Sequence, residues 1–141
     1  ASDVYKRQAE VLDDVNLIDP FIPEARALLG EALRRTATGD RRKLERGLFE
    51  SEKAVALKIV YTAGALHNQA ACLEGLDRKP EALRQAKSAL EADADHKEAR
   101  ELVARLEKAG VVPAPPLPPP PEDAAAPPPS DAPPPARPRE R

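Results

Sequence analysis

Few side chains in this chain have the chemistry for catalysis or for metal binding. The two histidines, His67 and His96, stand far apart, and nothing in the sequence pairs them at the spacing of metal ligands. Ser51, Ser88 and Cys72 lack a neighbouring histidine and acid that could activate a nucleophile. A glycine-rich phosphate-binding loop is absent as well. We therefore expect a protein that is not an enzyme and that uses no cofactor or metal ion.

These reactive side chains have plainer expected roles. A single cysteine, Cys72, excludes an internal disulfide and any multi-cysteine metal site. Its position inside a helical stretch predicts a small, buried thiol rather than a reactive one. For His67 and His96 we expect a solvated side chain or a helix cap.

The densest charge feature is a basic cluster in the first half of the chain. Its functional interpretation is a basic edge that docks an acidic partner or a polyanion. The plainer interpretation is a solvated helix end and turn, because acidic residues are interleaved and arginines suit a helix C-terminus. The six basic residues are Arg34, Arg35, Arg41, Arg42, Lys43 and Arg46.

Composition limits where these side chains can be positioned. The 141 residues allow one domain and little more, and 14 of the 17 prolines follow Gly110, where the packed part is expected to end. In residues 1–110, 19 basic and 20 acidic side chains nearly cancel, so we expect no nucleic-acid binding. No run approaches the roughly 20 apolar residues of a membrane span, so no membrane insertion is expected. Only two Tyr and two Phe are present, so the core must consist of Leu, Val, Ile and Ala.

Apolar residues recur with helical spacing almost throughout the first 110 residues. The pattern predicts six helices, mostly in antiparallel pairs because the connections are short. Pro80 suits a first helical turn, and Asp95 can cap the last helix. The helices are expected at about 4–17, from 23 onward, 41–58, 63–75, 79–92 and 97–108.

Small residues at set intervals mark the segment from Ala63 to Asp95 as two closely packed helices. The segment resembles the tetratricopeptide repeat, a helix–turn–helix unit of about 34 residues. The earlier Leu17-Ile18-Asp19-Pro20 resembles a unit ending, and Leu29-Gly30 the family's large-then-small pair. In the regular unit, the residues on packing positions are Leu66, Ala70 and Leu73 of the first helix and Ala82, Ala86 and Ala89 of the second.

The resemblance implies an all-α solenoid of antiparallel helix–turn–helix repeats over residues 1–110. Its register makes 3–18 an orphan second helix, 23–60 an irregular repeat, 63–95 a regular repeat and 96–109 a capping helix. The irregular repeat is about six residues too long, and Gly47 and Ser51 replace the usual alanine and aromatic residue. Residues 111–141 are expected to form a disordered, proline-rich tail.

The resemblance also implies a concave face that holds an extended peptide or a partner helix. Asn68 occupies the position where one subgroup uses asparagine to hold a peptide, although a helix-stabilising role fits it equally. The cations with which that subgroup grips a terminal carboxylate are replaced here by Ala27, Glu31, Glu98 and Leu102, so we expect a basic or polar ligand. The predicted concave face comprises Glu24, Ala27, Glu31, Gly64, His67, Asn68, Ala71, Glu74, Glu98, Glu101 and Arg105.

Both ends of the chain carry further expectations. Val4, Val11, Leu12 and Val15 share one side of the first helix, which needs a cover from upstream chain, a second copy or a partner. In the tail, Pro115-Pro116-Leu117-Pro118 resembles ligands of WW-type domains. The alternatives are a semi-rigid spacer or a tail that occupies the groove itself.

Together these features predict a noncatalytic scaffold or adaptor that binds a partner protein. Two alternatives stay open: an accessory C-terminal region of a larger enzyme, and a structural subunit of a multiprotein assembly, such as one in the cell envelope. The compartment is undetermined; the cytoplasm is the default, and the periplasm or envelope applies if an upstream signal was removed. Absent Met and Trp with abundant Ala, Arg and Pro fit a high-GC bacterial source.

Overall fold

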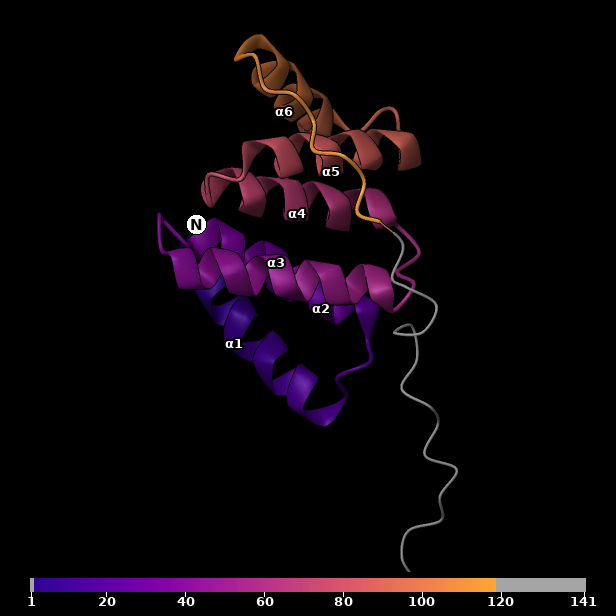
Figure 1. The fold of residues 1–141 in the computed structure, drawn as a ribbon. Coiled ribbons are helices and arrows are strands. Elements are labelled where there is room, and N and C mark those ends of the chain that lie inside the picture. Colours follow the sequence, from indigo (N-terminus) through magenta and orange to yellow (C-terminus); the bar gives the residue numbers. More distant parts are fainter. Residues whose placement is uncertain (1, 119–141) are drawn as a thin grey trace, which may run out of the picture.

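The computed structural model describes residues 2–118, and within this part it is all-α, as the sequence predicts. Consecutive helices are joined by short turns and stack as antiparallel neighbours, with α1 at one end and α6 at the other (Figure 1). None of the helices in this part is both long and apolar enough to cross a bilayer. The helices are α1 (Ser2–Ile18), α2 (Pro23–Thr36), α3 (Arg41–Ala56), α4 (Thr62–Gly75), α5 (Lys79–Ala92) and α6 (Lys97–Lys108).

Local sequence signals account for the starts of α2, α3 and α5. Pro23 opens α2 and Pro80 lies in the first turn of α5, where a missing backbone N–H leaves no helical hydrogen bond unmade. Asp40 caps α3, because its carboxylate accepts a hydrogen bond of 3.0 Å from the backbone N–H of Arg42.

Two predicted boundaries are corrected. The cap of α6 is His96 rather than Asp95, since the Nδ1 atom of His96 accepts a bond of 3.1 Å from the backbone N–H of Ala99. Helix α3 ends at Ala56, before the predicted end at Lys58, which adopts a left-handed φ of 64°.

Four of the small residues that the sequence pattern singled out are alanines, and they lie where the helices of the C-terminal half cross. Ala70 of α4 and Ala82, Ala86 and Ala89 of α5 are fully buried. Because these side chains are small, α4 and α5 approach closely while leucines from α3 and α6 fill the space around them. A second, smaller core joins α1 to α2.

Helices α2 and α3 approach closely through two glycines. A Cβ atom on Gly30 would lie 2.5 Å from the hydroxyl oxygen of Ser51 and 2.9 Å from the carbonyl oxygen of Gly47. A Cβ on Gly47 would lie 3.0 Å from the carbonyl oxygen of Gly30. This backbone contact explains why Gly47 and Ser51 stand where the repeat pattern leads one to expect larger residues.

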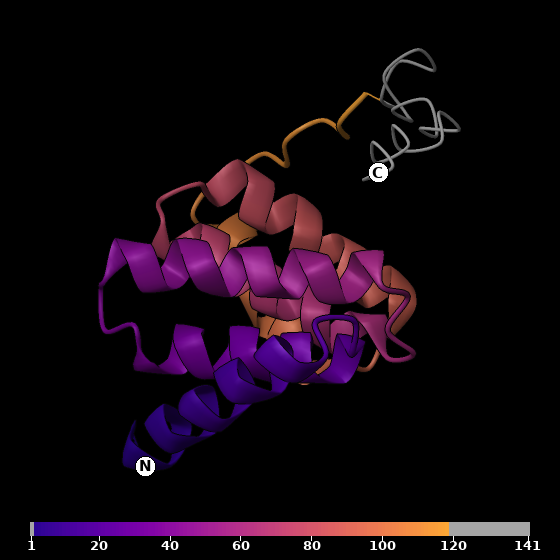
Figure 2. The same cartoon turned by 90° about the horizontal axis from the view of Figure 1, so that it is seen from below.

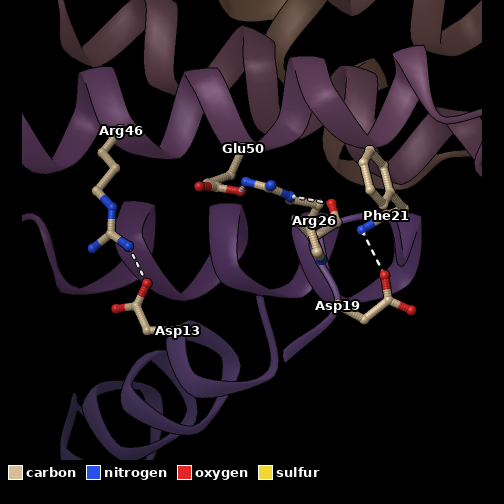
Figure 3. Close-up of polar contacts among 7 residues, drawn as sticks. Asp13, Asp19, Phe21, Arg26, Arg46 and Glu50 are labelled. Carbon is tan, nitrogen blue, oxygen red and sulfur yellow. Dashed lines mark hydrogen bonds and ion pairs between the residues drawn. The ribbon is translucent and has the colours of Figure 1, made fainter. Parts of the chain in front are cut away.

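Charged side chains complete the packing of the N-terminal half (Figure 3). The guanidinium of Arg26 on α2 donates to the buried carboxylate of Glu50 on α3 at 2.8 Å and to the carbonyl oxygen of Pro20 at 3.1 Å. Arg46 on α3 pairs with Asp13 on α1. Helix α3 is therefore tied by ion pairs to both helices that precede it.

The sequence predicts that the apolar residues of the first helix share one side. In the structure they do not. Leu12 is buried and Val15 partly buried against α2. Val4 and Val11 point elsewhere and are 66% and 61% exposed. The predicted need for a cover therefore applies to Val4 and Val11 only.

The packed part extends a few residues beyond its predicted end. Val111 packs against the core, the backbone N–H of Ala114 donates to the carbonyl oxygen of Pro80 at 2.9 Å, and Arg84 donates to the carbonyl oxygen of Pro115 at 2.8 Å. The start of the proline-rich segment thus lies along α5. The predicted disorder of the tail from residue 119 onward falls outside the described residues.

Candidate binding groove

Helices α2, α4 and α6 line one groove with a volume of about 790 Å³. Helix α4 lies between the other two and contacts both. All eleven residues of the predicted concave face lie in its lining. The lining also includes Leu102, at one of the replaced clamp positions, and residues that the sequence interpretation did not place there: Leu28, Arg34, Arg35, Ile59, Tyr61, Ala65 and His96.

Arg34 is held in an oriented position by a buried polar relay. Its Nε atom donates to the amide oxygen of Asn68 at 2.5 Å, and the amide nitrogen of Asn68 donates to the hydroxyl oxygen of Ser51 at 2.7 Å. Asn68 and Ser51 are buried. Gly30 leaves the space for this relay, because a Cβ there would collide with Ser51 and press on Asn68. The close contact of α2 and α3 thereby positions a guanidinium in the groove.

The charge of Arg34 has no carboxylate counterpart in the described part of the chain, where it takes part in no ion pair. Burial, with a smaller contribution from Arg35, lowers the pKa of Arg34 below its ordinary value. A partly buried cation without a counterion is costly, so an oxygen acceptor from a ligand would be favourable here.

Two of the groove's glutamates are neutralised by arginines. Glu31 accepts from Arg35 at 2.9 Å. Glu74 receives two hydrogen bonds from Arg105, at 2.7 and 3.2 Å. These pairs contribute little net charge to the surface that a ligand would meet.

The remaining glutamates leave an acidic excess on α2 and α6. Glu24 forms no ion pair with the described residues, and Glu101 has only a 4.0 Å contact with Lys97. Glu98 lies 3.7 Å from Nδ1 of His96, but that nitrogen already accepts the helix-cap bond and therefore carries no proton. Among the described residues, the groove thus combines a cation on α2 that has no ion pair with carboxylates on α2 and α6 that have no ion pair or only a long one.

The two histidines meet in the groove although they are distant in sequence. Their ring centroids lie 5.0 Å apart, and Tyr61 stacks beside His96 at 6.4 Å. His96 has the predicted capping role. His67 is half-buried, and burial followed by the charge of Arg34 lowers its pKa to about 4, so it is neutral at pH 7. No three potential metal ligands come together in residues 2–118.

Cys72 is buried behind the groove, as the sequence predicts. Its thiol lies 3.2 Å from the position of a Cβ on Gly47, and burial raises its pKa to about 12. The thiol is thus kept protonated and shielded.

The six basic residues of the proposed docking edge do not share one surface. Arg34 and Arg35 line the groove, and Arg46 is paired with Asp13 (Figure 3). The other three, Arg41, Arg42 and Lys43, lie in the first turn of α3. The sequence contains a signal that could have placed Arg34 in the groove, because Arg34 lies three residues after Glu31 on the same face of α2.

Comparison of the chain with protein-family models, with curated proteins and with solved structures finds no match. The functional conclusion therefore depends on the geometry and charges of the groove.

Proposed function

We propose that the protein is a noncatalytic interaction module, a tetratricopeptide-like scaffold or adaptor, that binds an extended segment of a partner protein between α2, α4 and α6. The observation that carries the proposal is the oriented guanidinium of Arg34, which has no carboxylate partner among the described residues. The relay through Asn68 and Ser51 fixes its direction, so little side-chain entropy is lost when a ligand binds.

The charges in the groove define the chemistry of the ligand. An oxygen acceptor, from an acidic side chain or a backbone carbonyl, would bond to the free nitrogens of Arg34. Lysines or arginines beside that acceptor would meet Glu24 on α2 and Glu98 and Glu101 on α6. We therefore expect the basic or polar segment to contain an oxygen that accepts a hydrogen bond from Arg34, with basic residues beside it.

Selection from a display library of random twelve-residue segments tests this function, with the full chain as bait. We expect the enriched sequences to share an acceptor flanked by basic residues. Arg34→Gln should weaken their binding about tenfold, since a charged hydrogen bond contributes about 1.5 kcal/mol. Arg41→Gln is the matched control, because Arg41 is exposed at the start of α3 and lies outside the groove lining. Equal binding by both variants would contradict the proposal.

A further inference from the structure

Helix α1 carries a second apolar stripe that no described part of the chain covers. Val4, Val11 and Ile18 are spaced seven residues apart and are 66%, 61% and 86% exposed. Residues at this spacing lie on one side of a helix, two turns apart. Leu12 lies on another side of α1, buried against α2. Helix α1 therefore has two apolar sides, only one of which is buried.

The position of α1 leaves this stripe accessible. Helix α1 lies at one end of the stack, next to α2 and away from α4, α5 and α6 (Figures 1 and 2). On its other flank, Asp13 reaches Arg46 of α3 (Figure 3). In a helix of 3.6 residues per turn, Val11 and Asp13 point about 160° apart, so the stripe faces away from α3.

One edge of the stripe carries charges of opposite sign. Arg7 lies on this edge in the first half of α1 and Asp14 in the second half, whereas Lys6, two residues after Val4, points to the other side of the helix. Arg7 and Asp14 are exposed, and neither forms an ion pair with the described residues. The first turn of α1 also contains the acidic Asp3, so the inference depends on the charges of Arg7 and Asp14 and not on the charge of the helix as a whole.

We infer that the stripe on α1 binds α1 of a second copy of this chain, antiparallel, about a two-fold axis through Val11. In this register Val4 faces Ile18 of the second copy, and Val11 faces its own equivalent. Arg7 lies beside Asp14 of the second copy, and the symmetric contact repeats this pair at the other end. A two-fold interface requires such self-complementarity in both shape and charge.

The alternative arrangements fit the charges less well. A parallel pair would place Arg7 beside Arg7 and Asp14 beside Asp14, which is repulsive. An unrelated partner has no reason to match a pattern that inverts about the middle of the stripe. The interface lies on α1, so the inference does not depend on what the groove of α2, α4 and α6 binds.

Sedimentation velocity of the full chain over a wide concentration range tests this inference. We expect the mass to rise toward twice that of the monomer as the concentration increases. Val11→Asp should abolish the dimer without unfolding the chain, because Val11 is 61% exposed. The matched control is Val60→Asp, in the α3–α4 turn, where the side chain is 93% exposed. A chain that remains monomeric, or a dimer that Val11→Asp leaves intact, would overturn the inference.

Charge reversal distinguishes a second copy from any other occupant. Arg7→Glu and Asp14→Arg each place like charges together twice in the dimer and should weaken it roughly tenfold. A mixture of the two single variants should form a heterodimer as tightly as the wild type dimerises, because every contact again joins opposite charges. If the mixture associates no better than either variant alone, the antiparallel register is wrong.

Discussion

Helices α4 and α5 pack through fully buried alanines and leucines, whereas α1, α2 and α3 combine a smaller apolar core with ion pairs and a glycine contact. Ala82, Leu83 and Ala86 have no exposed surface. In the N-terminal half, the buried carboxylate of Glu50 pairs with Arg26, and exposed valines remain on α1. The two halves thus differ in what they contribute. The regular half, α4 to α6, contributes most of the fully buried apolar core, and the irregular half, α1 to α3, contributes the oriented guanidinium of Arg34 and the exposed side of α1.

The largest expected effect concerns the regular half. Leu83→Ala should lower the free energy of unfolding by about 4 kcal/mol, because it leaves a cavity among side chains that cannot collapse. Leu12→Ala, in the small core between α1 and α2, should cost only about 2 kcal/mol, since that site is at the edge of the fold. Urea denaturation followed by circular dichroism measures both. Equal losses would remove the difference between the two halves.

The buried ion pair is the corresponding test in the irregular half. Glu50→Gln should cost about 3 kcal/mol, because it leaves the guanidinium of Arg26 enclosed without a counterion. Replacing both partners, with Arg26→Met and Glu50→Leu, should recover most of that loss. Thermal unfolding compares the three proteins. If the double variant is less stable than the single one, the ion pair contributes more to the stability of the fold than the neutralisation of its two charges.

Acid stability should reflect His67 in the groove. Its folded pKa of about 4 lies below the unfolded value near 6.5, so the unfolded chain binds more protons between these values. The contribution of neutral His67 is therefore complete above pH 6.5 and is lost as the pH falls toward 4. After allowance for solvent screening, we expect His67→Gln to flatten this decline by about 1 kcal/mol. Urea titrations at pH 7 and pH 4.5 measure the change, and an unchanged slope would contradict it.

The smallest effect concerns Asn16 on α1, whose side-chain oxygen and nitrogen are buried and make no hydrogen bond with the described residues. Asn16→Leu has nearly the same shape and should stabilise the chain by about 1 kcal/mol, because it removes an unsatisfied polar group. The measurement is the shift of the urea midpoint. Asn68→Leu is the informative contrast. The amide oxygen and nitrogen of Asn68 are both hydrogen-bonded, so this substitution should destabilise the chain instead.

Local periodicity predicted the helices, because the spacing of apolar residues follows the helical repeat. The resemblance to the tetratricopeptide repeat, and not periodicity, placed Glu24 and Glu101, which are distant in sequence, on one predicted face, and both line the same groove. What could not be predicted depends on tertiary contact. The relay from Ser51 to Asn68 requires the close approach at Gly30, and the pairing of Arg26 with Glu50 joins residues on different helices.

The direction of individual side chains was the second feature that could not be predicted from the sequence. Val11 and Leu12 are adjacent in sequence, so periodicity assigned both to one apolar side, yet only Leu12 meets α2. Likewise, Asp95 is the better cap by residue type, but the backbone places His96 at the capping position.

Hydrogen exchange of the full chain, with and without a segment selected from the display library, shows which helices a bound segment covers. We expect the segment to slow amide exchange in α2, α4 and α6, which line the groove. The effect should be absent in Arg34→Gln at the same segment concentration and present in Arg41→Gln. Slowed exchange confined to α3 and α5, with both variants behaving alike, would contradict this expectation.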